Sequence, residues 1–470
     1  MTTTLATDLH DLDLTEVAHL IQTRKVSPVE VTEAVLDRIA RLDGRLHAYA
    51  LVTAELAMEQ ARRAEDEIGK RRYRGALHGV PIGLKDLCYT KGITTAAGMP
   101  IHRDFRPTFD GTVVKRLYDA GAVCVGKLQL TEGAFADHHP DVVVPVNPWH
   151  PDHWSGASSS GSGVATAAGL CFGSIGSDTG GSIRFPCTAN GVTGLKPTWG
   201  RVSRYGAFEL AASLDHLGPM CRSAADTGVM LGAMAGADPN DPTASQKPVP
   251  DFLAGDDRDL TGVRIGVDDR YNGDGVDSLM VRTTQEAIRV LTGLGAQIVQ
   301  VRFPDVDQIL RDWLPLCAVE TAVAHEATFP ARRAEYGPGL AGLIDLARGV
   351  SATALQKIWL RRRDFTGRVA ALFQSIDLLA IPGQYVASPT IAQMATLGQD
   401  PNAFVALTRF SSPYDMAGVP VITLPSGFTP KNTPVAFQLV GRHWEEALLV
   451  RAGRAYQRET TWHRQRPKDH

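Results

Sequence analysis

Residues 156–163 read Gly-Ala-Ser-Ser-Ser-Gly-Ser-Gly, and residues 177–186 read Ser-Asp-Thr-Gly-Gly-Ser-Ile-Arg-Phe-Pro. Eleven glycines lie between Gly156 and Gly200, and eight serines lie between Ser155 and Ser182. Glycine at this density indicates a backbone that turns tightly or approaches another group closely, because glycine has no side chain to obstruct it. Together with serine it is typical of a phosphate-binding loop, or of a serine nucleophile beside backbone N–H donors.

The phosphate-binding interpretation lacks its specific motifs. No lysine in the chain is followed by serine or threonine, so the Walker A motif is absent. Thr166 stands where a dinucleotide fingerprint that begins at Gly161 would need its third glycine. The serine-hydrolase signals Gly-x-Ser-x-Gly and Ser-x-x-Lys are absent as well. A nucleophilic serine in this chain therefore needs a base from another part of the sequence.

Ser182 is the candidate nucleophile. Gly180 and Gly181 precede it, and two consecutive glycines let the backbone turn and aim successive N–H groups at one point beside the hydroxyl. This pattern predicts an oxyanion hole. The alternative interpretation is a glycine-rich turn that is closed by a capping serine.

Lys85 is the candidate base. It ends an apolar, strand-like run that begins at Gly79, and Asp86 follows it. Burial at the end of a strand disfavours the ammonium form and lowers the pKa of a lysine, and a neutral lysine can accept a proton near pH 7. The alternative is a strand-end lysine that forms an ion pair with Asp86.

The composition of the whole chain excludes several classes of protein. Its 470 residues include 48 Lys+Arg and 51 Asp+Glu, a formal net charge of −3, which gives no positive field for nucleic acid or an anionic membrane. The six cysteines form no Cys-x-x-Cys pair, and no run approaches the roughly 18–20 apolar residues of a membrane span. The acidic first 13 residues do not resemble a signal peptide. We expect a soluble cytoplasmic protein with no nucleic-acid partner and no membrane association.

Hydrophobic periodicity predicts an α/β fold. The first 70 residues read as helices: one begins at the capping box Ser27–Glu30 and ends at Gly44, and another covers about residues 53–68. From Val80 onward, short apolar runs alternate with amphipathic helices, which favours a sheet with helices packed against it. The expected strands are residues 80–84, 123–125, 263–267, 298–301, 378–381, 421–424 and 435–440.

No linker or internal repeat divides the chain into independent halves. We expect one domain of residues 1–470, with an N-terminal helical segment of about residues 1–70. The proline-rich stretch Ala237–Pro250 reads as a surface loop and is the candidate seam between subdomains. Two basic clusters, residues 70–74 and 361–363, are interpreted as solvent-exposed helix faces.

Lys85 and the two glycine-serine runs together resemble the amidase signature family of serine hydrolases. The matching segments are Gly79–Asp86, Gly156–Gly163, Asp178–Pro186 and Gly191–Thr198, with weaker similarity at Ala417–Pro420 and Phe437–Gly441. The resemblance covers most of the chain. It implies the amidase signature fold, a mixed β-sheet core with helices on both faces, and an active site that needs neither a metal nor an organic cofactor.

By this resemblance Ser182 is the nucleophile, Ser158 is the bridging serine and Lys85 is the base. The family's non-proline cis peptide at the bridging serine falls at Ala157–Ser158, where Ala157 replaces the more usual second glycine. The residues implied around these three are the oxyanion donors Thr179, Gly180, Gly181 and Ser182, the supporting residues Ser159, Asp178 and Arg184, and the acyl-pocket residues Glu132, Gly133 and Ala134. A variable region of about residues 300–400 is expected to form the rest of the pocket.

The resemblance implies an amidase that converts a small aryl or alkyl carboxylic amide to an acid and an amine or ammonia, through an acyl-enzyme on Ser182. A carbamate (a urethane), hydrazide or ester is the alternative substrate for the same residues. The expected partner is the small-molecule amide, and a homodimer is left open.

A metal-dependent hydrolase is a different alternative, because several nitrogen and oxygen ligands lie close together in the sequence. These residues are Asp137, His138, His139, His150, Asp152 and His153. Adjacent histidines on an extended backbone face opposite ways, however, and the spacing matches no helical ligand pair.

A glutaminase-type component of a tRNA amidotransferase is a further alternative, because Lys196–Gly206 closely resembles that branch of the family. That component reads the α-amino group of glutamine with an acidic residue shortly before an Asn-Leu-Ala-Gly run. This chain has Thr408 at about that place and Asp415 where the asparagine would be, which argues against a glutaminase. A catalytically inactive binding protein is disfavoured because all three catalytic positions hold competent residues.

Overall fold

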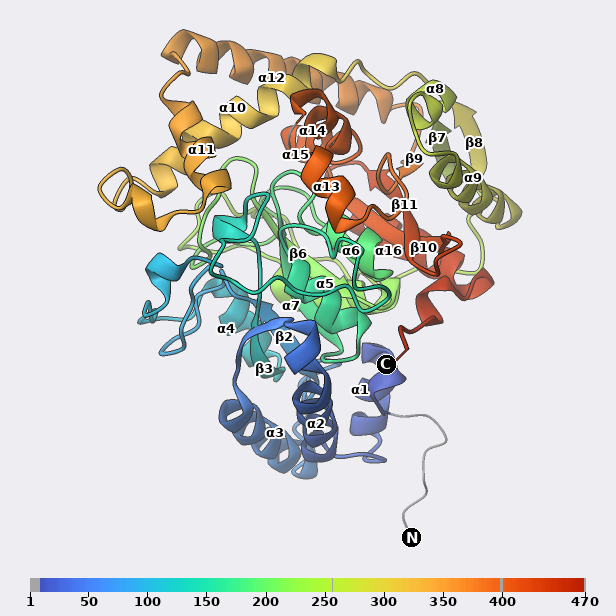
Figure 1. The fold of residues 1–470 in the computed structure, drawn as a ribbon. Coiled ribbons are helices and arrows are strands. Elements are labelled where there is room, and N and C mark those ends of the chain that lie inside the picture. The colour runs from blue at the N-terminus through green and yellow to red at the C-terminus, as the bar shows by residue number, and fades with distance from the viewer. Residues whose placement is uncertain (1–8, 256, 398–399, 469–470) are drawn as a thin grey trace.

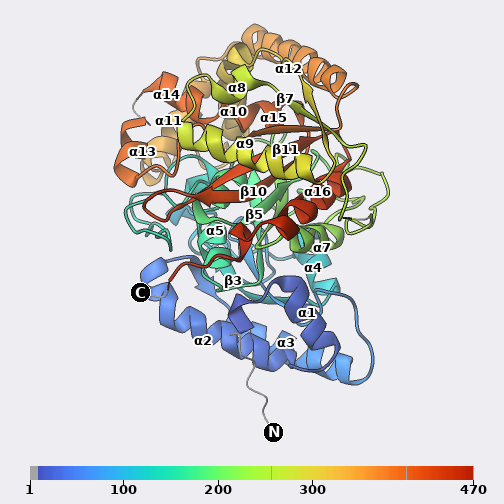
Figure 2. The same ribbon diagram turned by 90° about the vertical axis from the view of Figure 1, so that its right-hand side faces the viewer.

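An eleven-stranded mixed β-sheet runs through the molecule, and helices cover both of its faces (Figures 1 and 2). The computed structural model describes residues 9–255, 257–397 and 400–468. In spatial order the strands are β1 (Tyr49–Val52), β3 (Val123–Leu128), β2 (Pro81–Lys85), β4 (Gly173–Asp178), β6 (His216–Cys221), β5 (Thr193–Lys196), β10 (Val421–Phe428), β11 (Pro434–Gly441), β9 (Leu378–Pro382), β7 (Arg264–Val267) and β8 (Gln297–Gln300). Strand β2 is parallel to β3 and β4, and β7 is parallel to β8 and β9; the other neighbours are antiparallel. This is the α/β fold that the sequence predicts.

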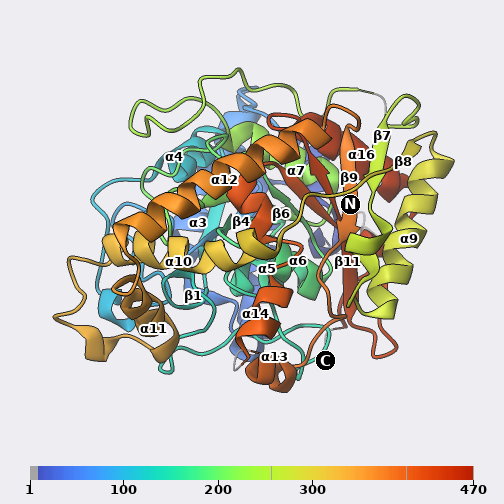
Figure 3. The same cartoon turned by 90° about the horizontal axis from the view of Figure 1, so that it is seen from above.

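Helices pack around the sheet. The helices are α1 (Leu14–Gln22), α2 (Pro28–Leu46), α3 (Ala54–Gly69), α4 (Thr112–Asp119), α5 (Ser160–Ala167), α6 (Arg184–Asn190), α7 (Ala224–Met234), α8 (Asp269–Gly273), α9 (Ser278–Gly293), α10 (Asp307–Ala324), α11 (Pro338–Ala347), α12 (Ala352–Leu372), α13 (Ile391–Leu397), α14 (Pro401–Leu407), α15 (Ser412–Ala417) and α16 (Glu446–Glu459). The first three lie at one end of the molecule, and α10 and α12 lie side by side at the other end (Figures 1 and 3). Between these ends, α5 packs on β4 and α6 packs on β10 and β11.

Seven strands lie where apolar runs predict them, but β1, β4, β5 and β6 are missing from the prediction. Strand β4 reads Gly-Ser-Ile-Gly-Ser-Asp, and all of it is buried. Small residues are required there, because a Cβ added to Gly176 would lie 2.6 Å from Met220 Sδ and 3.2 Å from Ser159 Oγ. Close packing therefore buries this strand without the hydrophobic pattern by which strands are recognised.

The helix that the sequence predicts to end at Gly44 continues to Leu46 as α2, so that boundary is wrong. The stop lies at His47, which has a left-handed backbone with φ 52° and donates its N–H to the Asp43 carbonyl. The Asp43 carboxylate accepts the N–H of Ala48 at 2.8 Å. Asp43, and not the glycine, caps the end of this helix.

The basic cluster at residues 361–363 is only partly the solvent-exposed face that the sequence predicts. Arg363 is exposed, and Arg361 pairs with Asp312 of α10 at 2.6 Å. Arg362 is partly buried and donates to Ser213 and Met416. The prediction is wrong for Arg362 because a long arginine stem can carry its guanidinium inward to buried acceptors.

The stretch 237–250 contains no helix or strand, in agreement with the predicted loop. Over the described ranges, no helix combines the length and the apolar character that crossing a membrane requires.

Candidate active site

Lys85 lies at the carboxyl end of the buried strand β2, and its side chain is fully buried. Its Nζ is 2.7 Å from Ser158 Oγ and 2.8 Å from both Ser159 Oγ and Ser177 Oγ. The amine therefore lies at the centre of three hydroxyl groups. These come from the two glycine-serine runs quoted above, which the fold brings together on one amine.

The alternative interpretation of Lys85, an ion pair with Asp86, is wrong. Asp86 pairs with Lys127 of β3 at 3.2 Å, and its carboxylate also accepts the N–H of Ala96 at 2.9 Å. Alternation along a strand sends successive side chains to opposite sides, so Lys85 and Asp86 have different surroundings.

Burial lowers the pKa of Lys85 to about 7, while the more distant carboxylates of Asp178 and Asp215 act in the opposite direction. A substantial fraction of this lysine is therefore neutral at physiological pH. A neutral amine has two N–H groups and one lone pair, so one of the three surrounding hydroxyl groups has to donate to Nζ. Ser159 is not that donor, because its hydroxyl donates to the Ser177 carbonyl at 3.2 Å.

Ser177 is a site residue that the sequence interpretation missed. Its only side-chain hydrogen bond in the described chain is to Lys85 Nζ. The signal was present, because Ser177 is the first residue of the second quoted run, but no local pattern tells which serine in a serine-rich stretch faces a distant lysine.

Ser182 is the one accessible residue in a buried stretch. Every residue from Ser158 to Asn190 is buried except Ser182, which is partly exposed. The peptide bond between Ala157 and Ser158 is cis, as the family resemblance implies. The two runs touch through their backbones, since Ser159 N–H donates to the Ser182 carbonyl at 3.3 Å and a Cβ added to Gly156 would lie 2.4 Å from Pro186 Cα.

Residues 179–182 leave β4 and present free N–H groups, and we call them the oxyanion loop after the role that the family resemblance predicts for them. The backbone N–H groups of Thr179, Gly180 and Ser182 donate to no group in the part of the chain that the structure describes. Gly181 differs from the expectation, because its N–H donates to Asp178 Oδ1 at 2.6 Å. The carboxylate of Asp178 turns back over the loop and occupies this donor.

Asp178 and Arg184 hold the oxyanion loop through hydrogen bonds. Arg184 Nε and Nη2 bind the Asp178 carboxylate at 2.9 and 2.8 Å, and both side chains are fully buried. Burial alone would raise the pKa of Asp178, but the guanidinium outweighs it and holds the pKa well below its usual range. Arg184 Nη2 also binds Asp415 at 2.6 Å. Arg184 therefore connects Asp178, which binds the loop, to Asp415 of helix α15.

Aromatic side chains flank the oxyanion loop. The indole of Trp313 donates to the Thr179 carbonyl at 2.8 Å, and a Cβ added to Gly180 would lie 2.4 Å from that ring. The Phe404 ring lies 6.2 Å from the Trp313 ring. A Cβ added to Gly181 would lie 2.4 Å from the Phe185 ring. The glycines are thus required by close approach, and aromatic rings lie against Gly180 and Gly181.

The chain matches the family model named Amidase over residues 30–450. It belongs to the amidase family. It is accordingly a hydrolase that acts on carbon–nitrogen bonds.

AmiD of Mycobacterium tuberculosis, a putative amidase, is 50% identical over 457 residues, which cover 97% of this chain and 96% of AmiD. One chain of the glutamyl-tRNA(Gln) amidotransferase of Chloroflexus aurantiacus is 37% identical over 495 residues, which cover 98% of this chain and 99% of that relative. The peptide amidase from Stenotrophomonas maltophilia has a similar structure, with a TM-score of 0.83, 29% identity and coverage of 100% of this chain and 99% of that chain.

In this amidase, the three residues expected to line the acyl pocket, Glu132, Gly133 and Ala134, do not all contact the same part of the structure. The Glu132 carboxylate is buried and accepts the N–H of Gly337, at the start of α11, at 3.0 Å. Burial raises its pKa. A Cβ added to Gly133 would lie 2.8 Å from Leu340. Glu132 and Gly133 thus lie against α11, whereas Ala134 lines a small cavity together with Ser177.

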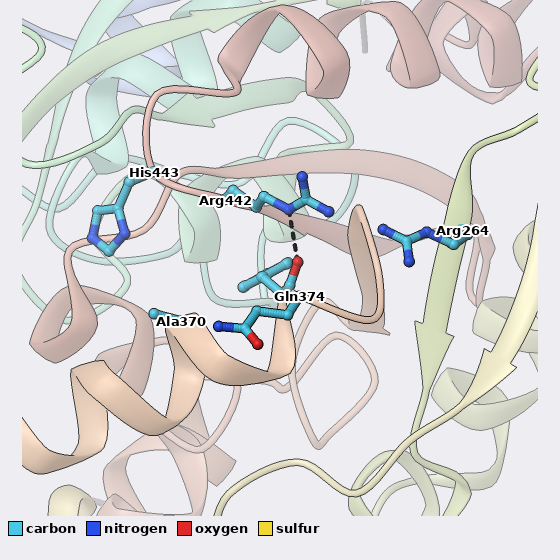
Figure 4. Close-up of a pocket in the computed structure, with 6 residues that line it drawn as sticks. Arg264, Ala370, Gln374, Arg442 and His443 are labelled. Carbon is cyan, nitrogen blue, oxygen red and sulfur yellow. Dashed lines mark hydrogen bonds between the residues drawn. The ribbon is translucent and has the colours of Figure 1, made fainter.

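Two hollows in the amidase differ in their relation to this site. A cavity of about 10 Å³, the size of one water molecule, is lined by Ala134, Ser177 and Asp215 among others. A larger hollow of about 580 Å³ is lined by Arg264, Ala370, Phe373, Gln374, Arg442 and His443 (Figure 4). None of the predicted site residues lines the larger hollow, and both of its arginines are paired with Asp377.

The residues of the metal-site alternative do not assemble in the amidase. Within the described ranges, no group of three or more His, Cys, Asp or Glu residues is arranged to hold a metal ion. His138 Nε2 is 3.0 Å from Ser160 Oγ, and His153 Nδ1 is 2.8 Å from the Ser388 carbonyl.

The side chains of Thr408 and Asp415, the two residues that bear on the glutaminase alternative, both form contacts within the chain. The Thr408 hydroxyl donates to the Val405 carbonyl of its own helix at 3.2 Å. Asp415 is fully buried and paired with Arg184. Neither position offers a free carboxylate to an α-amino group.

Proposed function

We propose that this amidase hydrolyses a small, uncharged carboxylic amide through an acyl-enzyme on Ser182. The observation that carries the proposal is the 2.7 Å contact between the buried Lys85 Nζ and Ser158 Oγ, beside a run in which only Ser182 is accessible. An aryl or alkyl amide suits the aromatic rings of Trp313 and Phe185, which lie against the oxyanion loop. A carbamate, hydrazide or ester is the alternative substrate at the same residues.

The proposed reaction begins with two proton transfers. Neutral Lys85 takes the proton of Ser158 while Ser158 takes that of Ser182, and Ser182 Oγ forms a bond to the carbonyl carbon. The carbonyl oxygen becomes an oxyanion. When it collapses, the carbon–nitrogen bond breaks, and the relay returns a proton from Lys85 through Ser158 to the leaving amine. A water molecule then gives a proton to the same relay and attacks the acyl carbon. The bond from that carbon to Ser182 Oγ breaks, the relay returns the proton to Ser182, and the acid leaves.

The N–H groups of Thr179, Gly180 and Ser182 are the proposed oxyanion donors, because they have no other acceptor in the described chain. Loss of one such donor typically lowers the rate by about 10²–10³-fold. The N–H of Gly181 does not join them while it donates to Asp178. In this proposal Asp178 and Arg184 hold the loop and do not touch the substrate.

The value of kcat/KM for a neutral amide should rise tenfold per pH unit below about pH 7 and level off above it. The active form has neutral Lys85, whose pKa is lowered to about 7 by burial, so activity is lost as the pH falls through that value. Initial rates from pH 5 to 9 with an amide that does not titrate in this range test the prediction. A profile that is flat across pH 7, or that falls as the pH rises, would contradict a lysine base.

The Ser177→Ala variant should turn over substrate about tenfold more slowly, because Nζ loses a hydroxyl that fixes the direction of its lone pair. The acid limb of its pH profile should also move to lower pH, since that hydroxyl stabilises the ammonium form. The matched control is Ser174→Ala on the same strand, because Ser174 Oγ lies by Thr166 and away from Lys85. An unchanged midpoint in Ser177→Ala would refute the assignment.

A panel of aryl and alkyl amides, esters, carbamates and hydrazides tests the substrate class. We expect turnover of neutral amides by the purified chain alone, with full activity after exhaustive chelation. Activity that is lost on chelation and restored by a metal would support a metal-dependent hydrolase. Hydrolysis of glutamine that begins only when partner proteins are added would support the amidotransferase alternative.

A further inference from the structure

The oxyanion loop is held from two sides, and the first support is a turn formed by residues 210–215. Thr179 Oγ1 donates to Asp215 Oδ1 at 2.6 Å. The Asp215 carboxylate also accepts the N–H groups of Leu210 at 2.9 Å and Ala211 at 3.1 Å. The position of this turn therefore sets the position of Thr179.

The second support is helix α15. Asp415 of this helix binds Arg184, which binds Asp178, and Asp178 accepts the N–H of Gly181. The side chains of Asp178, Arg184 and Asp415 are all fully buried. A shift of α15 would therefore move Arg184 and Asp178, and with them the N–H of Gly181.

Arg362 of α12 joins the two supports. Its Nη1 and Nη2 donate to the hydroxyl and the carbonyl of Ser213, each at 2.7 Å, so the guanidinium binds the turn twice. Its Nε donates to the carbonyl of Met416, in α15, at 2.8 Å. Only the planar fork of arginine can place three donors on acceptors from two elements at once, and the ammonium of lysine cannot span them.

Helix α10 holds the same turn from the other direction. The Glu320 carboxylate accepts the N–H of Ser213 at 2.8 Å and its hydroxyl at 2.7 Å. Trp313, seven residues earlier on the same face of α10, packs on Gly180. The turn is therefore clamped between Glu320 and Arg362, both from the variable region of residues 300–400.

We infer that Arg362 is a positioning residue that sets the geometry of the oxyanion loop by fixing the turn of residues 210–215 and α15 relative to each other. This inference rests on the proposed function. Arg362 acts through Ser213 and Met416 on the groups that hold Thr179 and Gly181. A contribution of this kind appears in the transition state, where the oxyanion forms, and much less in the binding of an uncharged substrate.

The test compares Arg362→Met with variants of its two neighbours. Arg361→Met removes the pair between α12 and Asp312 but leaves the contacts to Ser213 and Met416, so it loosens α12 without touching the clamp. Arg363→Met changes an exposed arginine on the same helix. Arg362→Lys keeps the charge without the fork. Each variant is assayed for kcat, KM, Tm and the rate at which a fluorophosphonate labels Ser182, because that reagent also places an oxygen in the oxyanion loop.

We expect Arg362→Met to lower kcat and the labelling rate by about 10–100-fold with little change in KM. Arg362→Lys should recover only part of this loss, and Arg361→Met and Arg363→Met should keep both rates. An equal loss in Arg361→Met, or a fall in Tm with unchanged kcat and labelling, would overturn the inference. If Arg362→Met does not fold, Ser213→Ala, which removes one contact of the turn to Arg362 and one to Glu320, should still show a loss in the same direction, because the contact of Arg362 to the Ser213 carbonyl remains.

The outcomes also separate this inference from the proposed function. If the wild type labels at Ser182 but hydrolyses no amide in the panel, the substrate proposal fails and the labelling rates still decide the role of Arg362. If the wild type shows neither turnover nor labelling at Ser182, the nucleophile itself is wrong, and the inference falls with it.

Discussion

The Ser182→Ala variant should lose turnover of every amide, ester and carbamate that the wild type hydrolyses, by about 10⁴-fold or more, while it stays folded. Removal of a nucleophile leaves only the catalysis that the oxyanion donors and substrate binding supply. Ser182 is partly exposed and its side chain forms no hydrogen bond within the described ranges, so its truncation breaks no hydrogen bond. The measurements are kcat/KM across the substrate panel and the Tm of both proteins.

A trapped intermediate gives this prediction a direct readout. Rapid quenching of the wild type with a slow ester substrate should yield a peptide around Ser182 that carries the acyl group, and the same peptide from Ser182→Ala should be unmodified. The matched control is Ser160→Ala, whose hydroxyl lies by His138. Turnover retained in Ser182→Ala would overturn the assignment of the nucleophile, and an acyl group on another serine would name its replacement.

Replacement of Lys85 should have the second largest effect, a loss of about 10²–10⁴-fold in kcat/KM. Without this amine, no group in contact with Ser158 can accept its proton, because Lys85 Nζ is its only side-chain partner in the described chain. Lys85→Met keeps an unbranched side chain of similar length in a buried position. The loss should be smaller for an activated ester than for an amide, because a good leaving group needs no proton from the relay.

Lys85→Arg separates the role of a base from that of a positive charge. A guanidinium stays protonated at any pH at which the protein is folded, so it can donate hydrogen bonds to the three serines but cannot accept a proton. We therefore expect Lys85→Arg to be as inactive as Lys85→Met. Substantial activity in Lys85→Arg would show that the site needs only a cation, and the proposed relay would be wrong.

The sequence locates the proposed chemistry because the motifs carry their own physical requirements. Gly180 and Gly181 are needed where a ring packs against bare backbone, and Gly156 is needed where two chain segments touch. Such requirements restrict the residue type at each position and so leave a readable pattern. Lys85 at the end of an apolar run follows the same logic, since burial of the run carries the amine into the interior with it.

The strands that carry the site were harder to predict than those around them. Strands β2, β3 and β7 to β11 follow apolar runs, whereas β4, which leads into the oxyanion loop, consists mostly of glycine, serine and aspartate. A hydrophobic pattern reports burial that large apolar side chains provide. It does not reveal a strand such as β4, which is buried because its small residues let neighbouring segments pack directly against its backbone.

The sequence by itself determined the family resemblance, the α/β class and the stretches that contain Lys85, Ser158 and Ser182, because glycine-rich turns and buried runs are local requirements. Tertiary structure alone decided that Ser177 contacts Lys85 and that Asp86 pairs with Lys127. It also decided that the Gly181 N–H is occupied by Asp178, and that Arg362 of a basic cluster reaches Ser213, 149 residues away in sequence. The physical reason is that a hydrogen bond depends on distance and direction, and for residues far apart in the chain only the packing of the sheet and helices fixes both.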